Sequence, residues 1–525
     1  MINKLLNRKY KLRLYKIFMI NFTFFIISTL AILIATLYPF KFAIPENFSL
    51  FHLVNNFNNA TFFKDQVNNV LLFLPFGFSI SNFLKQSKIK FAYQILIVVI
   101  ASCFLSLTVE IIQIFVPSRA PTPSDIYNNT FGGFLGLLCV YIFASRSFKY
   151  TLKRVENSRA SNSIYKISLF FIAYLCLIIL ISIPWQNAVS LSDWDNRFSL
   201  ILGNEFNGGR PWEGSMKNLA ILDKSYSKLE VQNIFSYQNK NSENTYLEPL
   251  DKNTSLLVFY DLSNSLNSQS YPDLAQQQPD LIWTKDSLNP AHFQQKRTTF
   301  NNENWLQSTS PISNLTERIR ETSEFTLIST IQSNNITQTG PARIISLSAD
   351  AHRRNFTLAQ EKDNLVFRLR TPITGANGSD IKLNIPKVFT DQREHHIIIT
   401  YSKAALEVYI DDIQNYHILN LLDLIPKEQI FFYYGITFIP MGLCLIFVIS
   451  LAKKKDRFYR YLLPTGILLP SLILESILVI NNGKTISWKT LFIGILFTTG
   501  TMLILKMRWS KTHLRRSREN FDTGI

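Results

Sequence analysis

Residues 65–77 read DQVNNVLLFLPFG, a polar start that runs directly into an apolar segment. Asp65 and Asn69 are four residues apart, so on a helix they share one face. The apolar residues that follow favour a membrane-spanning helix over residues 67–84, because such a helix needs about 20 mostly apolar residues. The stretch therefore predicts a membrane helix that carries an acid and an amide on one side of its entrance.

Two neighbouring segments combine a hydrophobic run with a polar end in the same way. The run over 91–116 contains Glu110 and Gln113 near its end, the following loop contains Arg119, and the next run opens with Asp125 and Asn129. Because consecutive spans run in opposite directions, these side chains fall at one membrane level. Ionisable groups at membrane depth are costly and usually functional. The predicted ligand-binding residues are Asp65, Asn69, Glu110, Gln113, Arg119, Asp125 and Asn129.

The same side chains allow two other interpretations. Asp65 and Asp125 stand where helix N-caps occur, and such caps with bonds between helices would make the cluster structural. Alternatively, a carboxyl kept protonated by burial can act as a general acid or base. In that case the candidate catalytic residues are Glu110, Asp125 and Asp65. No histidine lies near the cluster in the sequence and no nucleophile motif is present, so the choice between binding and catalysis stays open.

Composition and charge indicate a membrane protein. The 525 residues are 47% hydrophobic, and 54 Lys and Arg stand against 37 Asp and Glu, a net charge of +17. This balance excludes a disordered chain, and no nucleic-acid partner is expected. Lys and Arg gather at every second junction between spans, which predicts a multi-pass plasma-membrane protein with both termini in the cytoplasm. Eight spans are predicted, at 17–38, 67–84, 91–116, 130–145, 164–184, 429–452, 461–480 and 488–505.

The last three spans resemble a degenerate copy of the second to fourth. Phe438–Gly442 has the spacing of Phe73–Gly77, and the difference 440 − 75 between the two prolines is 365. The difference 475 − 110 between two glutamates is also 365, which makes Glu475 a secondary site candidate. The copy shows no clear counterpart of Asp65, Asn69, Arg119, Asp125 and Asn129. We therefore expect it to act as a scaffold half of the bundle.

The long middle segment is rich in Asn, Ser, Gln and Asp. Short runs such as Leu365–Leu369 and His396–Tyr401 alternate with turn signals, which predicts an exported all-β sandwich. The four cysteines all lie in apolar runs, so neither a disulfide framework nor a cysteine metal site is predicted, and no cofactor is expected.

The polar pattern of the first spans resembles that of the VanZ-like family. Its elements are Asp-x3-Asn and Phe-x-Pro-x-Gly on one helix, Glu-x-x-Gln on the next, and Arg before a Ser-Asp-x3-Asn-x-x-Gly helix start. This chain carries all of them within residues 17–145. The family is named for a teicoplanin-resistance protein, so the resemblance implies a protein of the bacterial envelope and does not imply a particular reaction.

The middle segment resembles laminin-G-like and concanavalin-A-like jelly rolls. His395–Tyr401 followed by Leu406–Asp412 is similar to their middle strands, and Leu200–Glu205 with Pro211–Leu222 is similar to their closing strands. Because the closing piece comes first here, we expect a circularly permuted domain, with a tandem of two partial sandwiches as the alternative. Such folds often bind glycans, but a fold does not fix a function. Trp and Arg suit stacking and forked hydrogen bonding with sugars, although Trp212 could instead belong to the core. The sugar contacts that the resemblance implies as candidates are Asn204, Glu205, Arg210, Trp212, Arg354 and Asn355.

The expected fold is an α-helical polytopic membrane bundle of about eight spans plus an extracytoplasmic all-β jelly-roll sandwich. The expected domains are a VanZ-like membrane domain at 1–163, a fifth span at 164–186, the sandwich at 187–425, a three-span domain at 426–508 and a basic cytoplasmic tail at 509–525. We expect the protein to bind a lipid-linked glycan or glycopeptide at the outer leaflet among membrane lipids. The sandwich would hold the sugar part, from the lipid-linked molecule or the cell wall. An integral-membrane enzyme acting on that substrate and a transporter are the alternatives.

Overall fold

The computed structural model describes residues 2–43, 63–87, 89–116, 122–143, 145–240, 254–263, 270–284, 297–350, 352–378, 382–425, 427–453 and 455–522. The chain forms two compact units. A helical unit combines residues 1–183, 426–477 and 486–525. A sheet unit combines residues 184–425 and 478–485.

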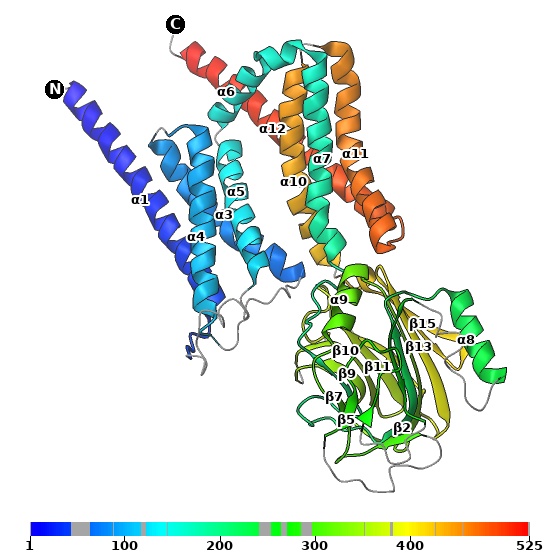
Figure 1. Ribbon diagram of the computed structural model, residues 1–525. Coiled ribbons are helices and arrows are strands. Elements are labelled where there is room, and N and C mark those ends of the chain that lie inside the picture. Colours follow the sequence, from blue (N-terminus) through cyan, green and yellow to red (C-terminus); the bar gives the residue numbers. More distant parts are fainter. Residues whose placement is uncertain are drawn as a thin grey trace. The chain divides into compact units, whose positions relative to one another are not determined.

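The helical unit begins with a first helical group made of α1 (Ile2–Leu37), α3 (Phe63–Gln86), α4 (Phe91–Gln113) and α5 (Pro123–Phe143). α3 packs against the other three helices, and α5 also packs against α4 (Figure 1). Phe73 and Phe76 of α3 form a buried cluster with Ile32 of α1 and Val109 of α4. Because lipid chains are as apolar as these side chains, the cluster stabilises the group by close packing rather than by removal from water.

A second helical group follows α6 (Ser145–Glu156) and the short turn η1 (Arg159–Asn162). It consists of α7 (Ile164–Asn187), α10 (Lys427–Ala452), α11 (Asp456–Asn482) and α12 (Trp488–Asp522). α10 packs against α12, and Tyr174 of α7 donates a hydrogen bond to the carbonyl oxygen of Gly466 in α11 at 2.7 Å. Phe148 and Leu152 of α6 are buried against Leu443 of α10.

Seven helices in the described part of the chain are long and apolar enough to cross a membrane: α1, α3, α4, α7, α10, α11 and α12. They correspond to seven of the eight predicted spans. The remaining prediction, 130–145, corresponds to α5, which begins at Pro123, a residue type favoured at the first position of a helix. Its first turns carry Asp125, Asn128 and Asn129, and α5 is not among the described helices that are apolar enough to cross a membrane. The predicted count of eight spans is therefore not confirmed. The tail predicted at 509–525 is continuous with α12 as far as Asp522.

The sheet unit contains an antiparallel two-sheet sandwich, which confirms the predicted all-β region. The eight-stranded sheet has the order β12-β11-β10-β9-β1-β7-β5-β4. The seven-stranded sheet has the order β15-β14-β13-β8-β2-β3, with β6 beside β2. The strands are β1 (Ser199–Leu202), β2 (Gly214–Leu222), β3 (Leu256–Asp261), β4 (Ser270–Tyr271), β5 (Leu281–Trp283), β6 (Thr298–Phe300), β7 (Leu306–Ser308), β8 (Phe325–Ser333), β9 (Ala342–Ser348), β10 (Arg354–Glu361), β11 (Asn364–Leu369), β12 (Lys382–Ile385), β13 (Glu394–Ser402), β14 (Ala405–Ile410) and β15 (Asp412–Asn420). A jelly-roll classification stays a prediction.

Aromatic rings pack between the two sheets. The ring of Phe325 in β8 lies 6.3 Å from that of Phe356 in β10 and 6.4 Å from that of Phe367 in β11. Successive residues of a strand point to opposite faces. Since Phe356 points toward the core, its neighbour Thr357 points away from it, and the same alternation defines the outer face of the eight-stranded sheet.

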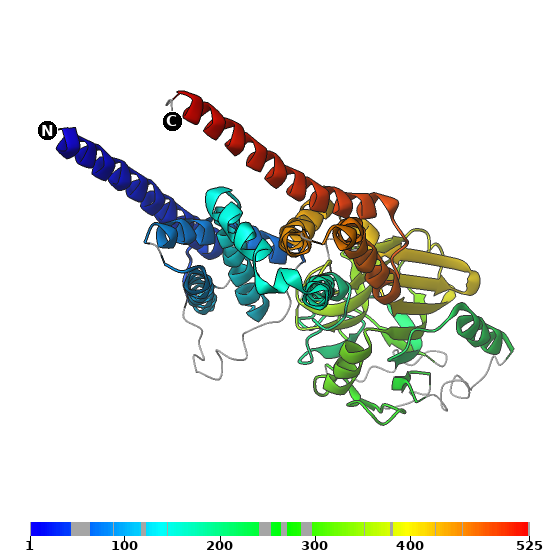
Figure 2. The same ribbon diagram turned by 90° about the horizontal axis from the view of Figure 1, so that it is seen from above.

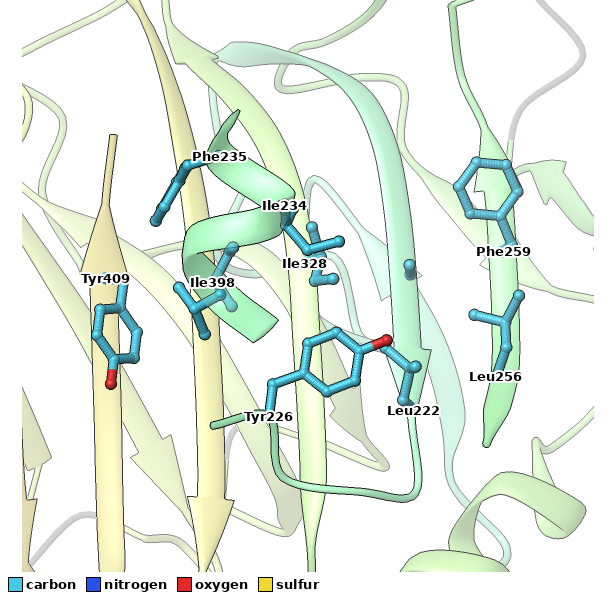
Figure 3. Packing of buried hydrophobic residues seen from close by; sticks show 11 residues of the cluster. Leu222, Tyr226, Ile234, Phe235, Leu256, Phe259, Ile328, Ile398 and Tyr409 are labelled. Carbon is cyan, nitrogen blue, oxygen red and sulfur yellow. The ribbon is translucent and has the colours of Figure 1, made fainter. Parts of the chain in front are cut away.

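Helix α8 (Lys228–Lys240) covers the outer face of the seven-stranded sheet. Figure 3 shows Ile234 and Phe235 of this helix against Ile328 and Tyr409 of the strands, within one buried cluster. Each such side chain contributes about 1.5–3 kcal/mol when fully buried. Both views place α8 at the edge of the sandwich (Figures 1 and 2). The sequence analysis predicted neither α8 nor α9 (Ser313–Thr322).

Candidate functional site

Glycines bring α3 and α5 into backbone contact. A Cβ atom added to Gly77 would lie 1.9 Å from the carbonyl oxygen of Gly133. A Cβ atom added to Gly132 would lie 2.3 Å from the carbonyl oxygen of Val70. Small residues allow membrane helices to approach this closely. The contact fixes the polar first turns of α3 and α5 beside each other.

Glu110 joins the end of α4 to the start of α5. Its side chain is 1% exposed, and its Oε2 accepts a hydrogen bond from the backbone N–H of Thr122 at 2.8 Å. Three residues further along α4, Gln113 donates from Nε2 to the carbonyl oxygen of Thr36 in α1 at 3.0 Å. The bond from Thr122 compensates part of the cost of burying a carboxylate, while Gln113 is directed toward α1.

Asp65 and Asp125 lie in the first turns of α3 and α5. The side chains of Asn69 and Thr122 lie beside the Asp125 carboxylate, which is within electrostatic range of Asp65 and of Glu110. Three carboxyl groups therefore share one site. Neither aspartate stands at an N-cap, since α3 begins at Phe63 and α5 at Pro123, but both lie in a first helical turn, where a negative charge is favoured by the helix dipole.

Several buried polar atoms of this site make no hydrogen bond to the residues that the structure describes. Asn129 is 2% exposed and donates from Nδ2 to Ser106 Oγ at 2.9 Å, but its Oδ1 has no partner. The others are Asn69 Nδ2, Ser102 Oγ, Thr122 Oγ1 and Asp125 Oδ1. Buried polar groups are normally bonded, and each unmade bond costs about 1–3 kcal/mol. Asn69 and Thr122 interact with the Asp125 carboxylate, so Ser102 Oγ and Asn129 Oδ1 are the clearest donor and acceptor for a polar ligand.

We call the residues around these atoms the polar site: Asp65, Asn69, Ser102, Ser106, Glu110, Thr122, Asp125 and Asn129. Of the predicted ligand-binding residues, Gln113 lies apart from it, and Arg119 lies outside the described residues. Among the described residues, no group of three or more His, Cys, Asp or Glu side chains could hold a metal ion.

The sequence analysis missed three members of the polar site. Thr122 stands just before α5, and Ser102 and Ser106 are buried on α4. A signal for the two serines was present, because Ser102, Ser106 and Glu110 follow one another at intervals of four residues in an otherwise apolar helix. A signal for Thr122 was also present, because Thr122 and Asp125 have the spacing of a capping box at the start of α5.

The second helical group repeats the geometry of the first at the offset seen in the sequence. α4 begins at Phe91 and α11 at Asp456, while α5 begins at Pro123 and α12 at Trp488. Both differences, 456 − 91 and 488 − 123, are 365. Gly442 corresponds to Gly77, and a Cβ atom added to it would lie 2.9 Å from the carbonyl oxygen of Thr498, which corresponds to Gly133. The close α3–α5 contact therefore has a counterpart between α10 and α12.

The second group carries different residues at the positions of the polar site. The offset pairs Asn69 with Tyr434, Glu110 with Glu475, Asp125 with Thr490 and Asn129 with Gly494. Tyr434 donates its hydroxyl to Glu475 Oε1 at 2.6 Å, and both side chains are buried. Tyr434 and Gly494 thus stand where the first group has the amides of Asn69 and Asn129. The buried acid of the second group, Glu475, accepts a hydrogen bond from a side chain of the same group.

In the sandwich, Trp212 and Asn355 serve the fold. Trp212 is fully buried, its ring packs over Gly214, and its Nε1 donates to Gln360 Oε1 at 2.9 Å. Asn355 is also buried, and its side chain exchanges two hydrogen bonds with the backbone of Asp195, at 2.8 and 2.9 Å. Neither side chain presents a face to a sugar, in agreement with the alternative stated for Trp212. The other four candidates lie together on the eight-stranded sheet.

Comparison with known proteins gives matches in the N-terminal region. Residues 14–144 match the VanZ/LLP1 family model. A stretch of 77 residues is 38% identical to Protein VanZ of Enterococcus faecium; it covers 14% of this chain and 43% of that protein, so less than half of the relative is matched. No solved structure matches the chain. The N-terminal region therefore contains a VanZ/LLP1 domain, and the matched residues include the whole polar site.

Proposed function

We propose that the first helical group binds the polar part of a bacterial envelope molecule, such as a lipid-linked glycan or glycopeptide. The carrying observation is a set of buried polar atoms without hydrogen-bond partners among the described residues, with Ser102 Oγ and Asn129 Oδ1 the clearest of them, next to three carboxyl groups. Polar and ionisable groups at membrane depth are costly and are usually functional. The match of this region to VanZ, a family associated with teicoplanin resistance, supports an envelope role.

The proposal includes an orientation in the membrane. Both termini lie in the cytoplasm and residues 187–425 lie outside, because Lys and Arg concentrate at every second junction. The polar site then opens toward the outer leaflet, where an envelope precursor presents its head group. In this arrangement the sandwich holds the sugar part of the same class of molecule, with Arg210 as the exposed candidate contact.

The internal repeat provides a matched control for a test of ligand binding. Full-length protein is purified in mild detergent as wild type, Glu110→Gln and Glu475→Gln, and the co-purifying lipids are identified by mass spectrometry. Glutamine keeps an acceptor oxygen and cannot ionise in either variant. We expect a polyprenyl-linked or glycosylated lipid to be enriched with the wild type and with Glu475→Gln, and to be lost from Glu110→Gln. The same bulk phospholipids in all three preparations would refute the proposal.

Formation of products distinguishes an enzyme from a protein that only binds the lipid. If the retained lipid is cleaved by the purified wild type and left intact by Glu110→Gln, the polar site catalyses a reaction on that lipid. Binding without turnover by the wild type, together with loss of the lipid from Glu110→Gln, leaves the binding function as the account of the site.

A further inference from the structure

Four arginines gather on the eight-stranded sheet. Arg343 lies at the start of β9, Arg354 at the start of β10, Arg368 in β11, and Arg210 in the loop after β1. The backbone N–H of Arg343 donates to the carbonyl oxygen of Arg210 at 3.0 Å. The charges of the four side chains lie within electrostatic range of one another. We call these four residues the arginine cluster.

Acidic residues do not balance the arginine cluster within the described part of the chain. Glu205 is 4% exposed, and its Oε2 lies 3.9 Å from Nε of Arg343. Asp350 and Glu361 also act on the cluster, but each pairs with another cation, at 2.7 and 3.2 Å respectively. The cluster therefore carries an excess of positive charge, and two of its four arginines, Arg343 and Arg354, are buried, while Arg368 is half-buried and Arg210 is exposed.

The buried arginines also have unused hydrogen-bond donors. Arg343 is 3% exposed, and its Nε and Nη1 make no hydrogen bond to the described residues; the same is true of Nε of Arg368. Burial, and then the charges of Arg354 and Arg368, lower the pKa of Arg343 to about 9. A desolvated cation without full pairing is costly, and a bound anion would relieve both the charge excess and the unmet donors.

Hydroxyl and amide groups surround the arginine cluster. Thr357 pairs in register with Arg368 on one side and with Ser346 on the other, on the face turned away from the core. The hydroxyls of Ser346 and Thr357 lie 3.3 Å apart and are buried although they are on the outer face. Nδ2 of Asn204, next to Glu205, is a further buried donor without a partner among the described residues. These groups suit a ligand that carries hydroxyls as well as charge.

We propose that the arginine cluster binds an acidic saccharide through its charged group, which is either a phosphate or a carboxylate. A guanidinium presents a planar fork of donors that matches either group in bidentate fashion. Arg343 and Arg368 hold the oxyanion, and Asn204 donates to a neighbouring oxygen of the sugar. The inference uses the sheet unit alone and does not rest on the function proposed for the first helical group.

The test uses full-length protein in mild detergent with three small probes: glucose 1-phosphate, glucuronate and neutral glucose. Binding is measured by ligand-observed NMR at constant ionic strength. We expect at least one acidic probe to bind at least tenfold more tightly than glucose, and the preference between them to identify the oxyanion. Arg343→Met and Arg368→Gln should each weaken that binding at least tenfold, whereas Arg393→Gln, which changes a 67% exposed arginine, should change it less than twofold.

Thermal unfolding separates a binding role from a structural one. If the charge excess at Arg343 serves a ligand, Arg343→Met should unfold at the same temperature as the wild type or higher when no probe is present. Arg368→Gln, at a half-buried position, keeps the test valid if Arg343→Met does not fold. Equal binding of acidic and neutral probes by the wild type, or unchanged binding in Arg368→Gln, would overturn the proposal.

Discussion

Replacing Gly77 by Ala perturbs the polar site through the backbone contact that positions it. The added Cβ atom would lie 1.9 Å from the carbonyl oxygen of Gly133, whereas ordinary contact begins at 3.4 Å. The difference, 3.4 − 1.9, requires α3 and α5 to separate locally by 1.5 Å. Neither atom belongs to a flexible side chain, so the helices themselves must move. Overpacking of this kind costs about 1–3 kcal/mol, and it draws Asn69 away from Asp125.

Gly442→Ala is the matched control because it makes the corresponding change in the second helical group. There the added Cβ atom would lie 2.9 Å from the carbonyl oxygen of Thr498, and the required separation, 3.4 − 2.9, is 0.5 Å. Both variants are compared with the wild type by thermal unfolding in detergent and by mass spectrometry of the retained lipid. We expect Gly77→Ala to destabilise the protein more and to be the variant that loses the lipid. Full lipid retention in Gly77→Ala, or equal loss in both variants, would refute the reasoning.

Three further predictions concern stability. Tyr434→Phe removes the donor to Glu475 and should cost about 1–3 kcal/mol in unfolding assays, with lipid retention unchanged; loss of the lipid would instead assign the ligand to the second group. Burial lowers the pKa of His396 below 6.5, so the unfolded chain binds more protons there and the unfolding temperature should fall as pH drops below about 6.5. His396→Gln should reduce this dependence between about pH 5 and 7, and an unchanged dependence would contradict the assignment. The buried carboxylate of Asp273 accepts hydrogen bonds from four backbone N–H groups. Asp273→Asn should therefore destabilise the sandwich by about 1–3 kcal/mol and lower its unfolding temperature by several degrees. An unfolding temperature equal to that of the wild type would contradict this prediction.

The helical half could be predicted well from the sequence because its signals are local. Long apolar runs set the helices, and residues four apart on one helix must share a face, which correctly placed Asn69 beside Asp65 on α3. The meeting of Glu110 and Asp125 followed from antiparallel neighbours alone. The bond from the backbone N–H of Thr122 to Glu110, in contrast, has no side-chain signature. The positions in the second group that correspond to Asn69 and Asp125 carry different residue types, Tyr434 and Thr490. For that reason they were not predicted as counterparts, although the offset of 365 residues was already apparent.

The sandwich shows where sequence reasoning stops. Its strands were recognisable one by one, but the arginine cluster depends on which strands are neighbours. Arg343 and Arg368 lie on strands that are separated in the sheet by β10, and β-bulges shift the register between β9 and β10. Neither fact can be read from spacing along the chain. Trp212 could be either a sugar contact or a core residue from the sequence alone, and its complete burial places it in the core.

The central claim is that the first helical group binds a polar envelope ligand and that the second, built on the same plan, does not. Native mass spectrometry of the protein in nanodiscs measures this directly, with a polyprenyl diphosphate carrying a disaccharide-pentapeptide as the probe. The account predicts that Glu110→Gln binds the probe at least tenfold more weakly than the wild type, a loss of about 1.4 kcal/mol or more, and that Glu475→Gln binds it as the wild type does. Equal affinity in all three proteins, or a larger loss in Glu475→Gln, would contradict the account.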